Sequence, residues 1–335
     1  MKIMCPLCEG EECVRLFESR DRVHGIPGTF TVFQCKLCRA VFYSPRLPPD
    51  DLSRYYPDTY GRYRQSKAVD KKQYRGIRRF VLENWYGYPS PRRGAGSLIL
   101  RWSAFFLSFA AARDAIPYRG GGNLLDVGCG GGSYLYRLKR WGWNVYGVEP
   151  STAGASQARS LGLNVYQGQI KEAGFRDSFF DVVRLSHVLE HLTDPRGTFC
   201  EIKRILKPDG MVYVTVPNAR SLNFRLFGEN WYGLDVPRHV VSYSPKALRF
   251  LCDAAGFEII RMRFRSGPFN FVRSVKYYLE EKSDHWPMWM RRINWPGNKP
   301  IRRALKPFFL LVDGLRLGDV LQAALQKTDR REEKI

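Results

Sequence analysis

The sequence lacks a hydrophobic run long enough to cross a membrane, since no stretch reaches about 18 consecutive uncharged apolar residues. The nearest candidate, residues 98–112, is interrupted by Arg101. The first ten residues, MKIMCPLCEG, also lack the apolar core of a secretory signal. We therefore expect a cytoplasmic protein.

Acidic side chains are scarce: 32 Asp and Glu stand against 54 Lys and Arg, which leaves a net charge of +22. Residues 61–119 carry 13 basic and 3 acidic side chains, and residues 261–335 carry 17 and 8. These two segments hold 19 of the 22 excess charges, while the stretch between them is close to neutral. A basic surface of this kind favours phosphate-rich partners, either nucleic acid or an anionic membrane.

Four of the eight cysteines form two closely spaced pairs, CPLC and CKLC. Disulfides are rare in a cytoplasmic chain, whereas each pair offers two thiolates to one tetrahedral ion. The 26 residues between the pairs are enough for a hairpin sheet. We predict a zinc ribbon with a structural ion, because four protein ligands close the coordination sphere; a redox site is the alternative. The predicted zinc ligands are Cys5, Cys8, Cys35 and Cys38.

The middle of the chain reads as strand, glycine turn, helix and second strand. Residues 123–127 form a short apolar strand, and Gly128, Gly130 and Gly132 follow it. Glycines let the backbone approach a ligand, and the start of the next helix presents free N–H groups. Glu149 ends the second strand, 21 residues after Gly128, where a carboxylate can accept both ribose hydroxyls of a nucleoside.

The pattern D-x-G-x-G-x-G, which begins at Asp126, resembles the S-adenosylmethionine (SAM) site of class I methyltransferases. The resemblance implies that the glycine turn lies beside the methionine part of SAM and that Glu149 holds the ribose. It further places the end of the third strand beside the adenine and the end of the fourth beside the methyl group. The cofactor-binding residues it implies are Asp126, Gly128, Cys129, Gly130, Gly132, Glu149, Pro150, Gln169, Ile170, Ser186 and His187.

The same resemblance continues through residue 262 and implies an α/β fold. We expect a seven-stranded, mostly parallel, Rossmann-like methyltransferase sheet, with a small N-terminal zinc ribbon and basic helical flanks. The expected regions are a zinc ribbon at 1–45, a basic aromatic linker with helices at 46–119, a SAM-binding domain at 120–264 with a substrate cap near 220–245, and a basic amphipathic helical tail at 265–335.

A hydroxyl or carbon acceptor needs a base, and histidine is the usual choice near neutral pH. Among the five histidines, His239 is favoured, because W-x-x-x-D-x-P-R-H places it beside Asp235 and Arg238 in the expected cap. A structural loop held by Arg238 is the alternative, and His187 is the second candidate base. The order H-x-x-E-H, from His187 to His191, leaves open either a metal site or simple packing of the second histidine.

The whole pattern resembles bacterial class I methyltransferases that carry a four-cysteine zinc module and act on sugar, polysaccharide or lipid-linked acceptors. We therefore expect methyl transfer to a hydroxyl, with carbon as the second choice, of a saccharide, a lipid-linked intermediate or a related small molecule. Nucleic acid is the less favoured partner, because Ser186-His187-Val188-Leu189 stands where base-amine methyltransferases carry N/D-P-P-Y/F. An RNA methyltransferase that grips phosphate and a non-catalytic SAM-binding scaffold remain the alternatives.

The basic flanks mix aromatic residues with apolar helical faces. Trp286, Trp289 and Trp295 lie in the second flank, beside basic residues. Basic and aromatic side chains next to an apolar face suit an anionic bilayer surface. This composition favours peripheral attachment to the inner face of the membrane over an RNA contact or simple packing on the core.

Overall fold

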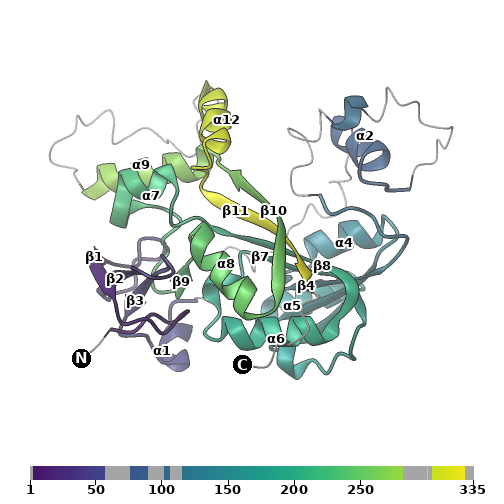
Figure 1. Cartoon of the computed structure of the whole chain (residues 1–335), viewed down its shortest axis with the longest axis horizontal. Coiled ribbons are helices and arrows are strands. Elements are labelled where there is room, and N and C mark those ends of the chain that lie inside the picture. Colours follow the sequence, from purple (N-terminus) through teal and green to yellow (C-terminus); the bar gives the residue numbers. More distant parts are fainter. Residues whose placement is uncertain are drawn as a thin grey trace. The chain divides into compact units, whose positions relative to one another are not determined.

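The computed structural model describes residues 3–56, 76–89, 102–105, 115–281, 300 and 304–328 of this 335-residue chain (Figure 1). The membrane expectations for Trp286, Trp289 and Trp295, and for most of the apolar segment 98–112, lie outside these residues. Among the described residues, no helix has the length and apolar character needed to cross a bilayer.

One sheet has seven strands in the order β10-β11-β8-β7-β4-β5-β6. Its pairs β4–β5, β4–β7 and β5–β6 are parallel, whereas β10–β11 is antiparallel. The predicted mostly parallel, Rossmann-like methyltransferase fold is confirmed. The strands are β4 (Asn123–Val127), β5 (Asn144–Glu149), β6 (Asn164–Gln167), β7 (Phe180–Ser186), β8 (Leu206–Pro217), β10 (Phe257–Arg265) and β11 (Val320–Lys327).

The seventh strand, β11, corrects the expected helical tail. Helices α9 (Pro268–Glu281) and α12 (Lys306–Gly314) are present, but β11 follows them as an extended strand. It pairs along its whole length with β10, and the two run side by side in Figure 1. Alternate side chains of a strand face the same side, and Leu321, Ala323 and Leu325 are buried accordingly. The prediction of a wholly helical tail was therefore wrong over these residues.

A second sheet contains four strands in the order β1-β2-β3-β9, all antiparallel. The first three form the N-terminal hairpin region and are β1 (Cys13–Ser19), β2 (Phe30–Cys35) and β3 (Val41–Ser44). The fourth, β9 (Val241–Ser242), comes from the segment predicted as the substrate cap. The cysteine-bearing hairpin and the cap segment are thus joined through one sheet.

The chain forms two compact units, which interleave along the sequence. The first comprises Met1–Pro57, Ser186–Cys200 and Val214–Ile335, and the second comprises Asp58–Leu185 and Glu201–Tyr213. In the first unit, Val32, Tyr43, Trp231 and Leu234 belong to one hydrophobic core. The core of the second unit contains Leu124, Leu135, Trp143, Ala158 and Val165.

Short helices connect the strands of both units. In the second unit they are α2 (Gly76–Asn84), α4 (Ser133–Lys139), α5 (Thr152–Ser160) and η1 (Ile170–Glu172). Helix α6 (Pro195–Ile205) runs from the first unit into the second. The first unit contains α1 (Pro49–Ser53), η2 (Leu189–His191), α7 (Leu222–Phe227), η3 (Gly228–Asn230) and α8 (Pro245–Ala254), the last of which packs against β10.

Candidate functional site

The glycine turn after β4 has the backbone conformation that its sequence requires. Gly128, Gly130 and Gly132 have φ angles of 66°, 54° and 75°, a region that residues with a side chain rarely occupy. The N–H groups of Gly128 and Cys129 donate to the carbonyl of Val148, at 2.7 and 3.1 Å. These bonds tie the turn to the neighbouring strand β5.

Glu149 ends β5 and is held against the turn. Its Oε2 accepts a hydrogen bond from the Gly130 N–H at 2.7 Å, and its Oε1 accepts one from the Ser151 N–H at 3.0 Å. The residue is 5% exposed. A carboxylate oxygen accepts more than one hydrogen bond. The contact of Glu149 with the ribose of SAM stays a prediction.

The register of the sheet aligns the carboxyl ends of β4, β5 and β7. Val127 pairs with Val148 on β5 and with Leu185 on β7. Within the second unit, the glycine turn and Glu149 therefore lie at neighbouring carboxyl ends of parallel strands, which is where open α/β sheets bind ligands. His187 follows Ser186 directly.

Asp126 has an additional partner that the sequence did not reveal. Its carboxylate is 2% exposed and accepts a hydrogen bond from Arg184 at 2.7 Å. Burial raises the pKa of Asp126, and Arg184 opposes that effect. The Arg184 guanidinium in turn lies 3.9 Å from the ring centroid of Tyr134. The protein itself therefore holds this carboxylate, and direct contact with SAM stays a prediction.

The remaining predicted cofactor residues differ in accessibility. Pro150 and Gln169 are exposed, whereas Cys129 and Ile170 are buried. Gln169 caps η1, since its own N–H donates to Glu172 at 2.9 Å. Their contacts with SAM also stay predictions.

We expect Glu149→Ala to weaken SAM binding more than about tenfold, because a charged contact to two hydroxyls is lost. Calorimetric titration of SAM into the purified protein measures this. Glu149→Gln is the matched control, since it keeps one oxygen acceptor for the Gly130 N–H and should lose less affinity. Near-normal affinity in the alanine variant would contradict the ribose assignment.

Gly132 is required for packing as well as for the turn. A Cβ atom there would lie 2.5 Å from Leu163 Cδ1 and 2.8 Å from Ala158 Cβ. We expect Gly132→Ala to lower the free energy of unfolding by about 2–4 kcal/mol, through overpacking and left-handed strain. Gly131→Ala is the control for urea unfolding, because its nearest neighbour is the flexible Gln157 side chain at 3.2 Å. Equal losses in both variants would refute the packing argument.

The four predicted zinc ligands come together at the base of the N-terminal hairpin. Sulfur atoms of Cys5 and Cys38 lie 3.5 Å apart, as do those of Cys8 and Cys35. All four lie within 4.8 Å of one another. Ligands around a tetrahedral zinc with bonds of about 2.3 Å are about 3.8 Å apart, so the group fits one ion.

The same backbone turn occurs at both cysteine pairs. The residue after each pair, Glu9 or Arg39, has a left-handed φ of 61° or 64°. The N–H of that residue donates to the carbonyl of the first cysteine of its pair, at 2.9 Å for Cys5 and 3.0 Å for Cys35. Two matching turns that present four sulfurs to one point are the arrangement expected of a structural zinc site.

A second group of polar side chains gathers in the same unit, from η2 and from the cap segment. We call it the histidine–carboxylate cluster. Burial raises the pKa of Glu190, but the hydrogen bond from His187 and the nearby His239 and His191 outweigh it and lower that pKa to about 2. A fully buried carboxylate is therefore ionised among histidines. The members of the cluster are His187, Glu190, His191, Asp235 and His239.

The three histidines of the cluster have different surroundings. His187 is 35% exposed, and its Nδ1 lies 3.1 Å from Glu190 Oε1. His239 is 7% exposed, and its Nε2 lies 3.8 Å from Asp235 Oδ2 and 3.9 Å from Glu190 Oε1. The ring centroids of His191 and His239 are 4.7 Å apart. The sequence singled out His187, His239 and Asp235 as catalytic, and all three lie in this cluster.

Arg238 anchors the cap segment to the N-terminal hairpin. Its guanidinium is fully buried and donates to Asp21 at 2.6 and 3.2 Å and to Asp235 at 2.6 and 3.1 Å. It also donates to the carbonyl of Tyr55 at 3.0 Å. Burial raises the pKa of Asp21, but its hydrogen bonds, chiefly from Arg238, hold that pKa below its usual range. Sequence reasoning missed Asp21, which lies 217 residues away and in no motif.

Two residues of the cluster have strained backbone conformations. His187 has a φ of 56° and Asp235 a φ of 38°, both in the left-handed region that favours glycine. Such strain persists only where the surroundings impose it, and it gathers at functional sites.

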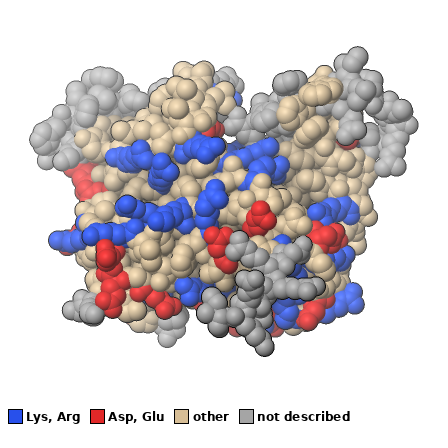
Figure 2. All heavy atoms as spheres, viewed as in Figure 1, with Lys and Arg blue, Asp and Glu red and all other residues tan. Residues whose placement is uncertain are grey.

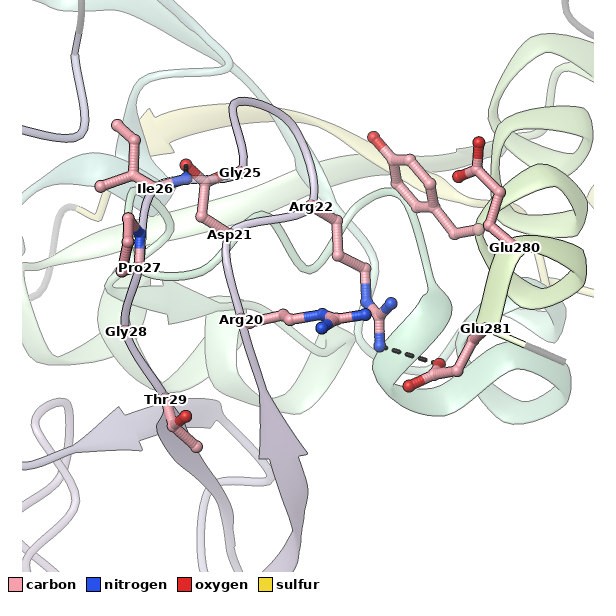
Figure 3. A pocket seen from close by; sticks show the side chains of 11 residues that line it. Arg20, Asp21, Arg22, Gly25, Ile26, Pro27, Gly28, Thr29, Glu280 and Glu281 are labelled. Atoms are coloured by element: carbon pink, nitrogen blue, oxygen red, sulfur yellow. Dashed lines mark hydrogen bonds and ion pairs between the residues drawn. The ribbon is translucent and has the colours of Figure 1, made fainter. Parts of the chain in front are cut away.

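A pocket of about 490 Å³ opens beside the hairpin loop that carries Asp21. The loop residues 20–29 form one side, and Tyr277, Glu280 and Glu281 at the end of α9 form the other. Figure 3 shows the ion pair across it, in which Arg22 donates to Glu281 at 2.9 Å. The pocket thus has side chains of both charge signs and adjoins the loop that holds Arg238.

Comparison with known proteins found methyltransferases that resemble part of this chain. Residues 97–262 match a family model described as a methyltransferase domain. A ubiquinone biosynthesis O-methyltransferase of Hahella chejuensis is 29% identical over 170 residues, which is 47% of this chain and 70% of that protein. The protein of the same name from Xanthomonas campestris pv. campestris is 32% identical over 153 residues, which is 44% of this chain and 61% of that protein. These matches span less than half of this chain and about two thirds of the relatives.

Two solved structures align with part of this chain. A SAM-dependent methyltransferase from Archaeoglobus fulgidus has a TM-score of 0.45 and 22% identity, and the alignment covers 66% of this chain and 94% of that chain. An S-adenosylmethionine-dependent methyltransferase from Mesorhizobium loti has a TM-score of 0.44 and 16% identity, with 66% and 97% covered. The family model spans the glycine turn, Glu149, the segment from His187 to His191, and the cap segment with His239.

Proposed function

We propose that this chain is a SAM-dependent methyltransferase that transfers the methyl group to a hydroxyl of a lipid-linked or saccharide acceptor. One observation carries the proposal. Within the second unit, β7 pairs with β4, the strand that leads into the glycine turn, and the histidine–carboxylate cluster begins at His187, which follows β7 in the sequence. A proton acceptor is thereby attached to the strand end where the cofactor is expected.

In methyl transfer, the cofactor and the protein have separate roles. The sulfonium of SAM activates the methyl group, so the protein has to align the acceptor and remove its proton. We assign the proton to His187, the more exposed of the two candidate bases. With Nδ1–H donated to the buried Glu190, the lone pair lies on Nε2, and the carboxylate stabilises the imidazolium that forms.

His239, the residue favoured by the sequence, receives a supporting task in this proposal. It is 7% exposed, its Nδ1–H donates to the carbonyl of Gly233 at 2.9 Å, and its Nε2 faces two carboxylates. Asp235 stands between His239 and the buried Arg238. These two residues would hold the cluster in shape, while His187 meets the acceptor.

The names of the relatives and the charge of the chain support the acceptor class. Both curated relatives are called O-methyltransferases, which favours a hydroxyl, and ubiquinone biosynthesis favours a lipid-linked acceptor. Lys and Arg side chains outnumber Asp and Glu on the face shown in Figure 2, in line with the net charge of +22. Basic side chains attract an anionic acceptor or an anionic membrane surface. We therefore include peripheral membrane attachment in the proposal.

We assign a structural Zn²⁺ to the four cysteines. The closed set of four thiolates leaves no position for substrate, so the ion would fold the hairpin and take no part in the reaction. The hairpin carries Asp21, which binds Arg238 of the cap segment. The zinc module would thereby support the site through the protein.

Methyl-labelled SAM, incubated with the purified protein and a lysate of its host, tests the proposal. We expect label in the lipid or glycan fraction, and about tenfold less label with the Glu149→Ala variant when SAM is kept below its dissociation constant. Label in RNA would show that RNA is the acceptor and that the basic segments bind its phosphates. RNA binding should then weaken steeply as the salt concentration rises. Binding of SAM without label in any fraction would instead favour a scaffold.

A further inference from the structure

The ring of the buried His239 and the ring of the half-buried His191 are oriented as metal ligands are. The Nδ1 atom of His239 lies 2.9 Å from the carbonyl oxygen of Gly233, and that of His191 lies 2.9 Å from the carbonyl oxygen of Arg238. Carbonyl oxygens only accept, so each Nδ1 carries the hydrogen, and Nε2 of each neutral ring keeps a lone pair. Histidines that bind metals are held in the same way, by donation from the other ring nitrogen.

Glu190 contributes an oxygen that nothing in the described part of the chain satisfies. The residue is fully buried, and its Oε2 has no hydrogen-bond partner there, whereas Oε1 accepts from His187. A buried polar atom is costly unless it is hydrogen-bonded or binds a metal. The unsatisfied oxygen therefore points to a bound group that supplies positive charge.

The distances between the possible ligand atoms fit a shared metal ion better than direct hydrogen bonds. Ligand atoms of Glu190, His191 and His239 all lie within 4.8 Å of one another. The 3.9 Å between His239 Nε2 and Glu190 Oε1 is too long for a hydrogen bond. It is only slightly longer than the ~3.4 Å that separates two ligands of a tetrahedral ion with bonds of about 2.1 Å.

The backbone fixes the two segments that supply these ligands. Val240, which follows His239, donates its N–H to the carbonyl of Glu190 at 2.8 Å. His191 is further held by Tyr56, whose hydroxyl lies 3.0 Å from its Nδ1. The ligands are thus preorganised before any ion arrives.

We infer that His191, His239 and Glu190 form a second metal site, which binds one divalent transition-metal cation through two imidazole Nε2 atoms and a carboxylate. Two histidines and one glutamate are a ligand set of catalytic zinc sites, which keep a position open for water or substrate. Imidazole and carboxylate ligands also accept Mn²⁺, Co²⁺ and Fe²⁺. Unlike the four cysteines, this site would leave room for an acceptor oxygen.

The inference goes beyond the proposed function, because cation binding does not require methyl transfer. If both hold, the acceptor hydroxyl would bind the cation, which lowers the hydroxyl pKa, and His187 would take the proton. His187 is the cluster histidine outside the proposed ligand set. The competing explanation is that His239 lies between Glu190 and Asp235 for packing alone, without any metal.

The test uses the full chain with one equivalent of zinc already bound by the cysteines. Titration with Mn²⁺, followed by electron paramagnetic resonance and calorimetry, should show one further cation per chain. We expect Glu190→Gln and His191→Ala each to weaken Mn²⁺ binding at least about tenfold while the zinc content stays at one. His24→Ala is the matched control, since it removes a histidine of the same unit that lies outside the cluster, and it should bind Mn²⁺ normally.

Circular dichroism checks that both ligand variants are folded. Two chemically different variants are used so that the test still works if one of them does not fold. No Mn²⁺ binding beyond the zinc equivalent, or equal binding in wild type and both ligand variants, would overturn the inference. Methyl transfer that persists with no second cation bound would overturn the metal site and leave the proposed function standing. A bound Mn²⁺ without methyl transfer to any fraction would overturn the proposed function and leave the metal site standing.

Discussion

Arg238→Met is expected to lower the free energy of unfolding by about 3–5 kcal/mol, because it leaves two carboxylates without their buried counter-charge. Arg238 is fully buried, and it donates to Asp21 from the hairpin and to Asp235 from the cap segment. Methionine fills much of the same volume without a charge, so the loss measures the missing ion pairs more than a cavity. Urea unfolding of the zinc-loaded protein gives the value.

Arg15→Met is the matched control for that experiment. Arg15 lies on β1 of the same hairpin and pairs with Glu18 at 2.7 Å, but both side chains are more than half exposed. Exposed pairs of this kind contribute about 0–1 kcal/mol. A loss at Arg238 no larger than the loss at Arg15 would show that the buried pairs do not tie the hairpin to the cap. Recovery of stability when Asp21→Asn and Asp235→Asn are added would confirm that uncompensated charge causes the loss.

The parts of the site that the sequence predicted are those determined by local chemistry. The glycine turn depends on three residues within five positions, and its left-handed angles follow from the absence of side chains. Each cysteine pair sets its own turn, so the spacing alone indicated four converging sulfurs. These predictions needed no knowledge of which segments meet in space.

The parts that the sequence could not predict depend on contacts between distant segments. Asp21 carries no motif, and only the folded chain brings it to Arg238. Glu190 and His239 are likewise 49 positions apart, and their closeness depends on the Val240–Glu190 backbone bond. Strand β11 was mistaken for a helix because Ala, Leu, Gln and Lys favour helices, a preference that pairing with β10 overrides.

His187→Ala is expected to lower kcat by about 100- to 10,000-fold, the range that a general base contributes. The reason is its position. It follows β7, it is 35% exposed, and its Nδ1 is bonded to the buried Glu190. The dissociation constant of SAM should change far less than kcat, because the ribose contact at Glu149 is untouched. Single-turnover rates with labelled SAM, once the acceptor fraction is known, provide the measurement.

His239→Ala serves as the comparison that separates the two candidate bases. If His239 only holds the cluster, its removal should lower kcat less than His187→Ala does. A larger kcat loss at His239, with stability unchanged, would return the base to the residue that the sequence favoured. Full activity in His187→Ala would remove that residue from the mechanism. Since His187 is outside the proposed metal ligands and His239 within them, this pair of variants also separates proton transfer from cation binding.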